Sequence, residues 1–357
     1  MFPDTNFSKL VRIQFPIIQA PMAGGPTTPE LVAAVSNSGA PGSFGAAVLA
    51  PEAIRQVIEE IRTRTKKPFN VNLFVLEKPN PDARQVARAL ELLGPIRAEL
   101  GMPPGTVPQK FGEDSENQFR ALLEAAPPVA SFTFGILTRE QVAALKSRGS
   151  LVIGSATTVA EAKAWEAVGA DAVCAQGSEA GGHRGTFLGD FESAMVGSMA
   201  LIPQIVDAVR VPVIAAGGIM DGRGIAAALM LGASAAQLGT AFLTCPEAGV
   251  SATWKTALRN AKDTQTMVTR AFTGRPARGI ANEFMLRLRD VQDEFPSYLI
   301  QGALTGPIRQ AAAKANRPEF TAMWAGQGAG MSRDLPAAEL VAKLVQETKK
   351  VLSDVSR

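Results

Sequence analysis

The fold is decided by residues 211–243, which read VPVIAAGGIMDGRGIAAALMLGASAAQLGTAFL. Two apolar runs at 211–219 and 235–243 flank a segment with helical character at 224–231. A strand that is buried on both faces reads as a continuous apolar run, and parallel strands are joined by crossover helices. The stretch therefore predicts one strand–helix–strand unit of a parallel sheet.

The same alternation extends toward the N-terminus. The other predicted strands lie at 16–22, 42–46, 69–75, 129–135, 151–156 and 172–177. Helical patterns separate them at 28–38, 51–65, 138–148, 159–168 and 199–209. Eight strand and helix units within about 250 residues are typical of a (β/α)8 TIM barrel, with a doubly wound sheet as the alternative.

Two further regions do not fit the simple repeat. The crossover at 79–128 is too long for a single helix, so we expect extra helices there at the mouth of the barrel. After the eighth strand, 297–315 and 336–353 both show helical spacing. We therefore expect a barrel at 1–245, closed by the helix near 336–353, and a mainly helical lid or subdomain at 246–335 that covers the substrate.

Composition narrows the function classes. The chain has 357 residues, of which 46% are hydrophobic and 19% charged, and its formal charge is only +3 without a long single-sign run. This pattern favours a small-molecule partner over nucleic acid or a membrane surface. Residues 1–10 lack the apolar core of a secretory signal, and Cys174 and Cys245 form no CxxC motif. These features predict a cytoplasmic protein.

Glycine collects where the predicted strands end, which is where barrels carry their sites. Gly217 and Gly218 end one strand, and 237–240 (QLGT) lie on the next. Backbone N–H groups at such turns and a following helix N-terminus favour an anion, and Thr240 adds a hydroxyl donor. We expect a phosphate site here, the alternative being close packing of helix on sheet. The loop at 20–28 offers the same choice between ligand approach and a tight turn.

The sixth strand runs into 176–187, QGSEAGGHRGTF, which contains the only histidine of the chain, His183. Imidazole titrates near neutral pH and suits a catalytic base or a polar hydrogen-bond partner, although an isolated histidine can also be structural. With one histidine and no cysteine cluster, no metal site is predicted. Asn72 and Gln176 are amides in apolar strands. Either their hydrogen bonds are satisfied within the protein, or the two amides contact the edge of a planar heterocycle.

Four segments are similar to the FMN-dependent nitronate monooxygenases, formerly called 2-nitropropane dioxygenases, and most of all to the class I bacterial type. They are 16–25 (PIIQAPMAGG), the strand containing Asn72, 177–187, and 212–219 continued through Thr240. The resemblance implies that the barrel holds FMN noncovalently and that His183 is the catalytic residue. It places the cofactor at Ala20, Pro21, Met22, Asn72, Gln176, Gly181, Gly182, Gly217, Gly218, Gln237, Leu238, Gly239 and Thr240.

The resemblance also implies a reaction. Alkyl nitronates such as the toxic propionate 3-nitronate, or nitroalkanes, would react with O2 to give carbonyl compounds and nitrite. This reaction would be a detoxification. We expect the protein to be a monomer or a homodimer. The family brings tyrosines and a basic residue from the C-terminal region into the pocket, whereas this chain has one tyrosine, and Gly306 where a basic residue is expected. Tyr298, Gln301 and Arg309 are candidate pocket residues, the alternative being an ordinary packed helix.

Two other functions remain open. Residues 179–183 (EAGGH) and 215–219 also resemble the FMN- and NADH-dependent enoyl-acyl-carrier-protein reductases, and an NADH:quinone reductase belongs to the same class of reaction. A noncatalytic flavin-binding barrel, in which His183 only satisfies buried polar groups, is the alternative outside enzymology. A shared barrel fold does not distinguish these chemistries.

Overall fold

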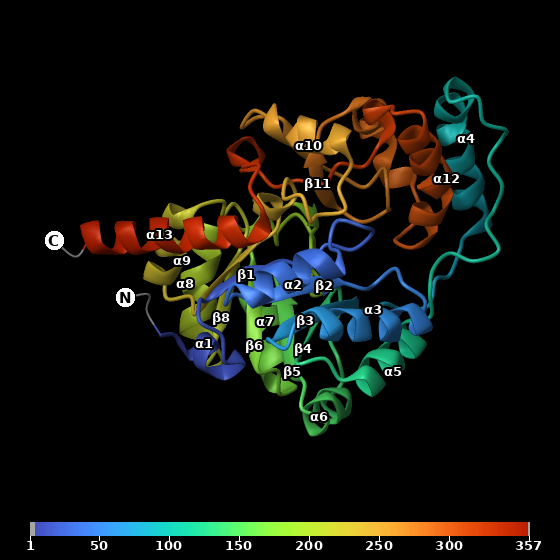
Figure 1. The fold of residues 1–357 in the computed structure, drawn as a ribbon. Coiled ribbons are helices and arrows are strands. Elements are labelled where there is room, and N and C mark those ends of the chain that lie inside the picture. Colours follow the sequence, from blue (N-terminus) through green and yellow to red (C-terminus); the bar gives the residue numbers. More distant parts are fainter. Residues whose placement is uncertain (1–3, 356–357) are drawn as a thin grey trace.

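The computed structural model describes residues 4–355 and confirms the predicted TIM barrel (Figure 1). The barrel strands are β1 (Ile17–Gln19), β2 (Gly42–Gly45), β3 (Phe69–Phe74), β4 (Val129–Thr133), β5 (Leu151–Ala156), β6 (Ala172–Gln176), β8 (Val213–Ala216) and β9 (Ala235–Leu238). All pair in parallel in the order β1-β9-β8-β6-β5-β4-β3-β2. The chain order runs around the sheet without the reversal that defines a doubly wound fold.

A buried side chain closes the seam between β1 and β2. The Gln19 backbone N–H donates to the Pro41 carbonyl at 3.1 Å. The Gln19 amide then imitates a strand, because its Oε1 accepts from the Ser43 N–H at 2.9 Å and its Nε2 donates to the Ser43 carbonyl at 3.1 Å. Gln19 is fully buried, so no water replaces these bonds. One amide therefore satisfies the edge of β2 where no regular ladder forms.

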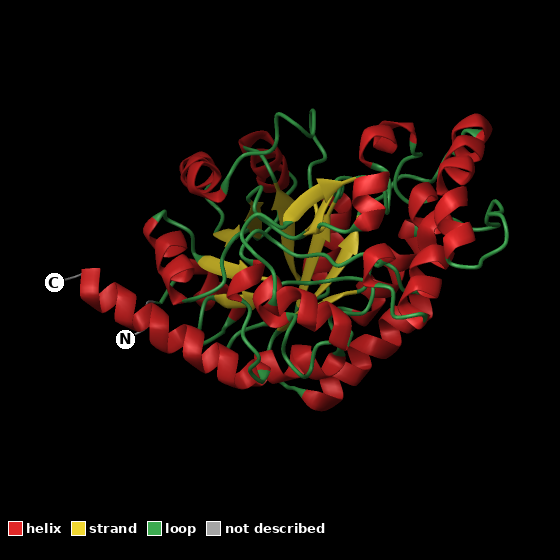
Figure 2. Ribbon diagram, turned by 90° about the horizontal axis from the view of Figure 1, so that it is seen from above, coloured by secondary structure: helices red, strands yellow, loops and turns green. Residues whose placement is uncertain are grey.

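Helices surround the strands, as the view from above shows (Figure 2). They are α2 (Pro29–Asn37), α3 (Pro51–Arg64), α5 (Ser115–Ala125), α6 (Arg139–Ser147), α7 (Val159–Ala167), α8 (Ser198–Ala208) and α9 (Gly222–Met230). Thr28, Thr138 and Thr158 cap three of them through side-chain oxygens. The long α13 (Ala337–Val355) packs on α9 and α2 and completes the helical layer between them.

The amino-terminal end of the barrel is plugged by α1 (Asn6–Val11). Its Phe7 and Val11 join Ile18, Ile153 and Cys174 in an apolar cluster inside the barrel. None of the helices within residues 4–355 is long and apolar enough to cross a membrane. Parallel α/β barrels place their sites at the opposite, carboxyl-terminal end of the strands, and the loops that follow β1, β6, β8 and β9 line the cavity there.

A second layer covers that end (Figure 1, top). It contains η1 (Thr240–Phe242), α10 (Ala252–Arg259), β10 (Thr266–Thr269), β11 (Ala277–Ile280), α11 (Glu283–Arg287), η2 (Arg289–Glu294), α12 (Ile300–Lys314), η3 (Pro318–Phe320) and η4 (Ala329–Met331). The layer is not purely helical, because β10 and β11 form an antiparallel hairpin. A short strand from the barrel, β7 (Gly182–His183), pairs with β11 and ties the two layers together.

The long crossover at 79–128 supplies two helices with different roles. α5 packs against α3 on the outside of the barrel, whereas α4 (Ala83–Glu99) packs against α12. α4 shares a separate apolar core with the covering layer, which includes Leu93, Phe272 and Leu304. We therefore propose that the subdomain predicted at 246–335 functions together with α4. Residues 1–3 of the predicted 1–245 barrel lie outside the described residues.

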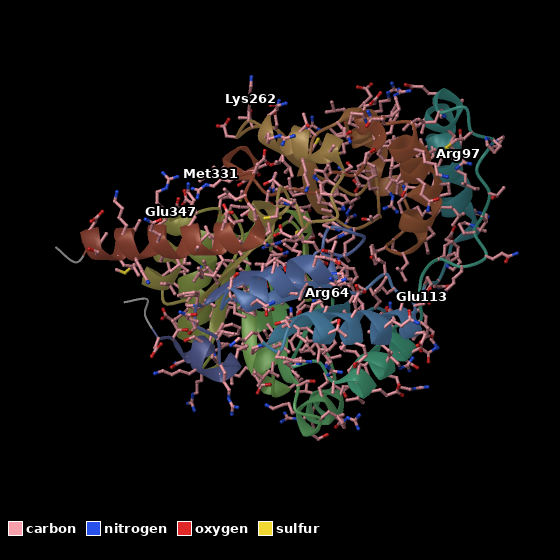
Figure 3. All side chains as sticks on the ribbon, in the orientation of Figure 1. Arg64, Arg97, Glu113, Lys262, Met331 and Glu347 are labelled. Atoms are coloured by element: carbon pink, nitrogen blue, oxygen red, sulfur yellow. The ribbon has the colours of Figure 1, made fainter. Side chains whose placement is uncertain are left out.

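The loop after α4 returns to the cavity. Arg97, nearly buried on α4, donates from Nε to the Pro103 carbonyl at 2.8 Å and holds the start of this loop. Farther along, Phe111, Gly112 and Glu113 line the cavity. Figure 3 shows Arg97 and Glu113 at the two ends of this path. A segment inserted between β3 and β4 thus forms part of the rim of the cavity.

Replacing Gln19 with Met tests the seam. The substitution keeps the volume but leaves the N–H and carbonyl of Ser43 without partners. Each buried unsatisfied group costs about 1–3 kcal/mol, so the free energy of unfolding should fall by about 2–5 kcal/mol in urea titrations. Gln56→Met on the exposed face of α3 is the control and should change it by less than about 0.5 kcal/mol. Equal stability of the two variants would show that the amide does not close the barrel.

Candidate active site

A large cavity lies between the carboxyl-terminal ends of the strands and the covering layer. Its volume is about 490 Å³, within the range of small-molecule and cofactor sites. It is lined by inward-facing side chains of β3, β4, β6 and β9, by the loop after β1, and by α12 and the 324–328 segment. Both layers of the molecule therefore contribute to one site.

Most of the residues singled out in the sequence meet in this cavity. Those that line it are Ala20, Pro21, Met22, Asn72, Gln176, Gly181, Gly182, His183, Gly217, Gly218, Gln237, Gly239, Thr240, Tyr298 and Arg309. Leu238 is absent from the lining because side chains alternate along β9, so that Gln237 faces inward and Leu238 packs in the core outside the barrel. Gln301 is also absent from it. Its fully buried amide donates instead to the Ala271 carbonyl at 2.7 Å.

The glycine-rich strand ends present backbone donors to the cavity. Gly217 and Gly218 have φ of +117° and +69°, in the left-handed region that glycine adopts without strain. The N–H groups of Gly218 and Gly239 donate to no acceptor within residues 4–355. The Thr240 hydroxyl accepts from the Gly326 N–H at 3.0 Å and keeps its own proton for a ligand. These groups form a cradle for an anion.

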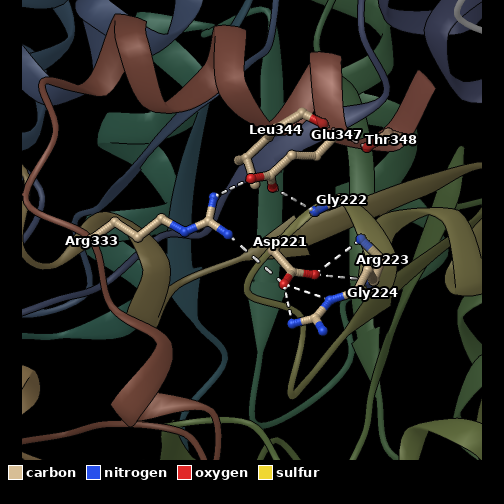
Figure 4. A network of polar contacts seen from close by, with 8 residues as sticks. All are labelled: Asp221, Gly222, Arg223, Gly224, Arg333, Leu344, Glu347 and Thr348. Carbon is tan, nitrogen blue, oxygen red and sulfur yellow. Dashed lines mark hydrogen bonds and ion pairs between the residues drawn. The ribbon is translucent and has the colours of Figure 1, made fainter. Parts of the chain in front are cut away.

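The prediction that a helix N-terminus contributes to the anion site is wrong for α9. Its first turn is capped by the Asp221 carboxylate, which accepts from the Arg223 N–H at 3.0 Å and from the Gly224 N–H at 3.4 Å. Asp221 also pairs with the Arg223 side chain, and the Arg333 guanidinium lies 3.8 Å away and bonds Glu347 of α13 (Figure 4). A carboxylate already occupies the positive end of α9, so the anion site depends on the strand ends.

The two amides predicted to face a ligand differ in whether they keep a hydrogen-bonding atom without a partner in the protein. The Asn72 Nδ2 donates to the Ser131 hydroxyl at 3.0 Å, while its carbonyl oxygen accepts from no group in the described part of the chain. The Gln176 Nε2 donates to the His183 carbonyl at 3.0 Å, and its Oε1 accepts from the Gly185 N–H at 2.8 Å. Asn72 therefore keeps an acceptor for a ligand, whereas Gln176 chiefly holds the segment that carries His183.

His183 stands in an aromatic enclosure. Its ring centroid lies 5.5 Å from Phe134 and 5.4 Å from both Tyr298 and Trp324. Burial, with smaller contributions from the positive charges of Arg275 and Arg309, lowers the pKa of His183 to about 3. The imidazole is therefore neutral at physiological pH and can act as a hydrogen-bond donor, an acceptor or a base.

Arg309 and Tyr298 bring polar groups from the covering layer. The Arg309 Nη2 donates to the Gly302 carbonyl at 2.9 Å, whereas its Nη1 meets no acceptor and its Nε is buried without one among the described residues. Burial lowers the pKa of Arg309 and raises that of Tyr298 to about 12, so the phenol stays protonated. A half-satisfied guanidinium beside a phenol is a site for an anionic group.

Several residues of the site had no signal in the sequence. Thr273, Phe134 and Trp324 line the cavity around His183. Phe134 follows β4 with φ of +79°, a strained value for a bulky residue, and its ring lies under the Arg275 guanidinium at 3.9 Å. Thr273 and Trp324 come from loops of the covering layer, which show no periodicity. Within residues 4–355, no group of three or more His, Cys, Asp or Glu side chains is placed to hold a metal ion.

Similarity to known proteins agrees with this geometry. The family model for nitronate monooxygenase matches residues 4–347. A probable nitronate monooxygenase of Staphylococcus haemolyticus is 42% identical over 99% of this chain and 100% of its own length. Among solved structures, nitroalkane oxidase from Streptomyces ansochromogenes has a TM-score of 0.90 and 42% identity, covering 98% of this chain and 99% of its own. FabK from Thermotoga maritima has a TM-score of 0.78 and 29% identity, covering 99% and 98%. The chain therefore belongs to the nitronate monooxygenase family of oxidoreductases.

Proposed function

We propose that this protein is an FMN-dependent nitronate monooxygenase that converts alkyl nitronates, such as propionate 3-nitronate, with O2 into carbonyl compounds and nitrite. The observation that carries the proposal is the content of one cavity. It holds a neutral imidazole, a half-satisfied arginine and an anion cradle of unpaired glycine N–H groups. A phosphorylated planar cofactor and a small anionic substrate match these groups.

FMN fits the residues that are present. The N–H groups of Gly218 and Gly239 and the Thr240 hydroxyl would hold its phosphate, and the free Asn72 carbonyl would contact the edge of its ring system. Every cofactor position implied by the sequence lies along the cavity except Leu238. When bound, FMN supplies an acceptor for the electrons of the substrate and a centre that reacts with O2.

The protein's own residues favour a substrate that has already lost its carbon proton. A histidine whose pKa is lowered to about 3 is a weak base in the free enzyme, but it hydrogen-bonds and orients an anion well. The Tyr298 hydroxyl is available to bind that anion, and the Arg309 Nη1 is available for a second anionic group such as the carboxylate of propionate 3-nitronate. The aromatic rings around His183 exclude water and strengthen these polar contacts.

Location and assembly belong to the same proposal. We place the protein in the cytoplasm, as a monomer or homodimer that detoxifies nitronates. The location agrees with Cys174 and Cys245, which are both free and buried.

The similarity to FabK supports a second candidate activity. That protein is 29% identical over nearly the whole chain, and residues 180–183 of the motif that resembles the enoyl-acyl-carrier-protein reductases line the cavity. An FMN- and NADH-dependent enoyl-acyl-carrier-protein reductase or an NADH:quinone reductase is therefore the competing activity. The two candidates differ in what reduces the flavin, which gives a direct test.

Oxygen consumption separates the candidates. The protein is loaded with FMN and given either propionate 3-nitronate or NADH, and nitrite is measured at the end. We expect rapid oxygen uptake and nitrite formation with the nitronate alone. Flavin reduction by NADH without nitronate turnover would move the assignment to a reductase. Failure to bind FMN would contradict the proposed anion cradle. A yellow protein that is inert to both substrates would indicate a noncatalytic flavin-binding barrel.

Replacing His183 with Asn should lower turnover of a neutral nitroalkane by about 10²- to 10⁴-fold, because removal of its carbon proton loses the base. Nitronate turnover should fall less, and FMN content should stay unchanged because other residues form the cradle. In the wild type, kcat/KM for the nitronate should show no imidazole ionisation between about pH 5 and 8, because the lowered pKa keeps His183 neutral there. Unchanged nitroalkane turnover in the variant at every pH would exclude His183 from the mechanism.

Replacing Arg309 with Met tests recognition of a carboxylate. One lost charge-assisted hydrogen bond corresponds to about 10- to 100-fold in affinity, so KM for propionate 3-nitronate should rise by that factor. KM for 1-propyl nitronate, which lacks the carboxylate, should rise much less. Arg139→Met on the exposed surface of α6 is the matched control and should change neither value. Equal increases for both nitronates would show that Arg309 does not bind the carboxylate.

A further inference from the structure

The hydrogen bonds around His183 favour one tautomer. The His183 Nε2 lies 2.8 Å from the Thr273 Oγ1, and the same hydroxyl lies 3.2 Å from the Arg275 carbonyl oxygen. A hydroxyl has one proton, and a carbonyl can only accept. If the Thr273 proton goes to the Arg275 carbonyl, the Nε2 must carry a proton and donate it to the Thr273 oxygen.

The opposite tautomer would leave the Arg275 carbonyl unpaired. With the proton on Nδ1, the Thr273 hydroxyl would donate to Nε2 and abandon the Arg275 carbonyl, which has no other donor within residues 4–355. Nδ1 makes no hydrogen bond within the described part of the chain and is free to meet a ligand in the cavity that His183 lines. An unpaired carbonyl is unfavourable, so the hydrogen bonds of Thr273 favour the Nε2–H form.

We propose that Thr273 is a positioning residue that fixes His183 as the Nε2–H tautomer and leaves Nδ1 as the lone-pair nitrogen for the substrate. The catalytic part of this inference rests on the proposed function, whereas the tautomer itself does not. With a neutral nitroalkane, the carbon–hydrogen bond breaks, the electron pair stays on the substrate as the nitronate, and the proton forms the Nδ1–H bond. The resulting imidazolium keeps its Nε2–H bond to Thr273.

The covering layer holds both partners rigidly. The Gln301 Nε2 donates to the Ala271 carbonyl at 2.7 Å, and the Thr305 hydroxyl donates to the Phe272 carbonyl at 2.6 Å, so α12 fixes the two residues before Thr273. His183 is held by the same hairpin, because β7 pairs with β11 and His183 lies opposite Ala277. Gln301, which does not reach the cavity, thus has a place in supporting the site.

The charges around the ring keep the imidazole neutral at physiological pH, so that it exists as one of its two tautomers. The charged or titratable groups that bear on it are Arg275, which precedes β11, and Arg309 and Tyr298 from the α12 region. Both arginines are positive and Tyr298 is neutral, and burial acts in the same direction as the arginines. The imidazole therefore has one proton, and Thr273 decides which nitrogen holds it.

Nitrogen-15 NMR of the FMN-loaded protein reads the tautomer directly. The chain has a single histidine, so a preparation without a histidine tag gives one pair of ring nitrogens, and protonated and unprotonated nitrogens differ widely in chemical shift. We expect a protonated Nε2 in the wild type and in Thr273→Ser, and a mixed or Nδ1-protonated ring in Thr273→Val. An Nδ1–H ring in the wild type, or an unchanged Nε2–H ring in Thr273→Val, would overturn the proposal independently of any activity.

Turnover provides the second readout. Thr273→Val should lower kcat for a neutral nitroalkane by about 10- to 100-fold with little change in KM, while nitronate turnover stays within about 3-fold. Thr273→Ser should restore nitroalkane turnover to within about 3-fold of the wild type. Thr348→Val, which removes a buried hydroxyl of α13, is the matched control and should change neither the tautomer nor turnover. Equal losses with both substrates in Thr273→Val would indicate a merely structural role and contradict the assignment.

Discussion

The site depends on the main-chain pairing of β11 with its neighbours. On one edge β11 pairs with β10, and on the other with β7, which carries His183 out of the barrel. Gly279 of β11 also bridges to Trp324, and the Ala325 N–H donates to the Arg278 carbonyl. One four-residue strand thus brings the barrel loop, the hairpin and the 324–328 segment to a common position. Without it, the residues that enclose the imidazole would belong to three unconnected loops.

The two layers divide the chemistry between them. The barrel contributes backbone N–H groups and amides, which the rigid strand ends hold in place, as with Gly218, Gly239 and Asn72. The covering layer contributes charge and aromatic rings, including Arg309 and Trp324. Backbone donors suit a cofactor that every turnover reuses, whereas side chains on a separate layer can differ between relatives and set substrate choice.

The regular parts of the chain were predictable from the sequence, whereas the irregular parts were not. The strands were predictable because each is buried on both faces and reads as an apolar run, and His183 was conspicuous as the only histidine at a glycine-rich strand end. Leu238 was misplaced because a contiguous motif ignores the alternation of side chains along β9. Gln301 was misplaced because helical spacing alone does not say which face of α12 meets the cavity. The capping of α9 by Asp221 was likewise overlooked.

Local patterns were enough to predict the barrel, its glycine-rich strand ends and the single imidazole, because periodicity and local backbone freedom are properties of neighbouring residues. The surroundings of that imidazole follow from long-range packing. Thr273 and Trp324 approach His183 from positions about 90 and 140 residues away in the chain. α4 joins the covering layer from the middle of the barrel sequence. Such contacts arise from the packing of one layer on another, and no local pattern records which long-range partners will meet.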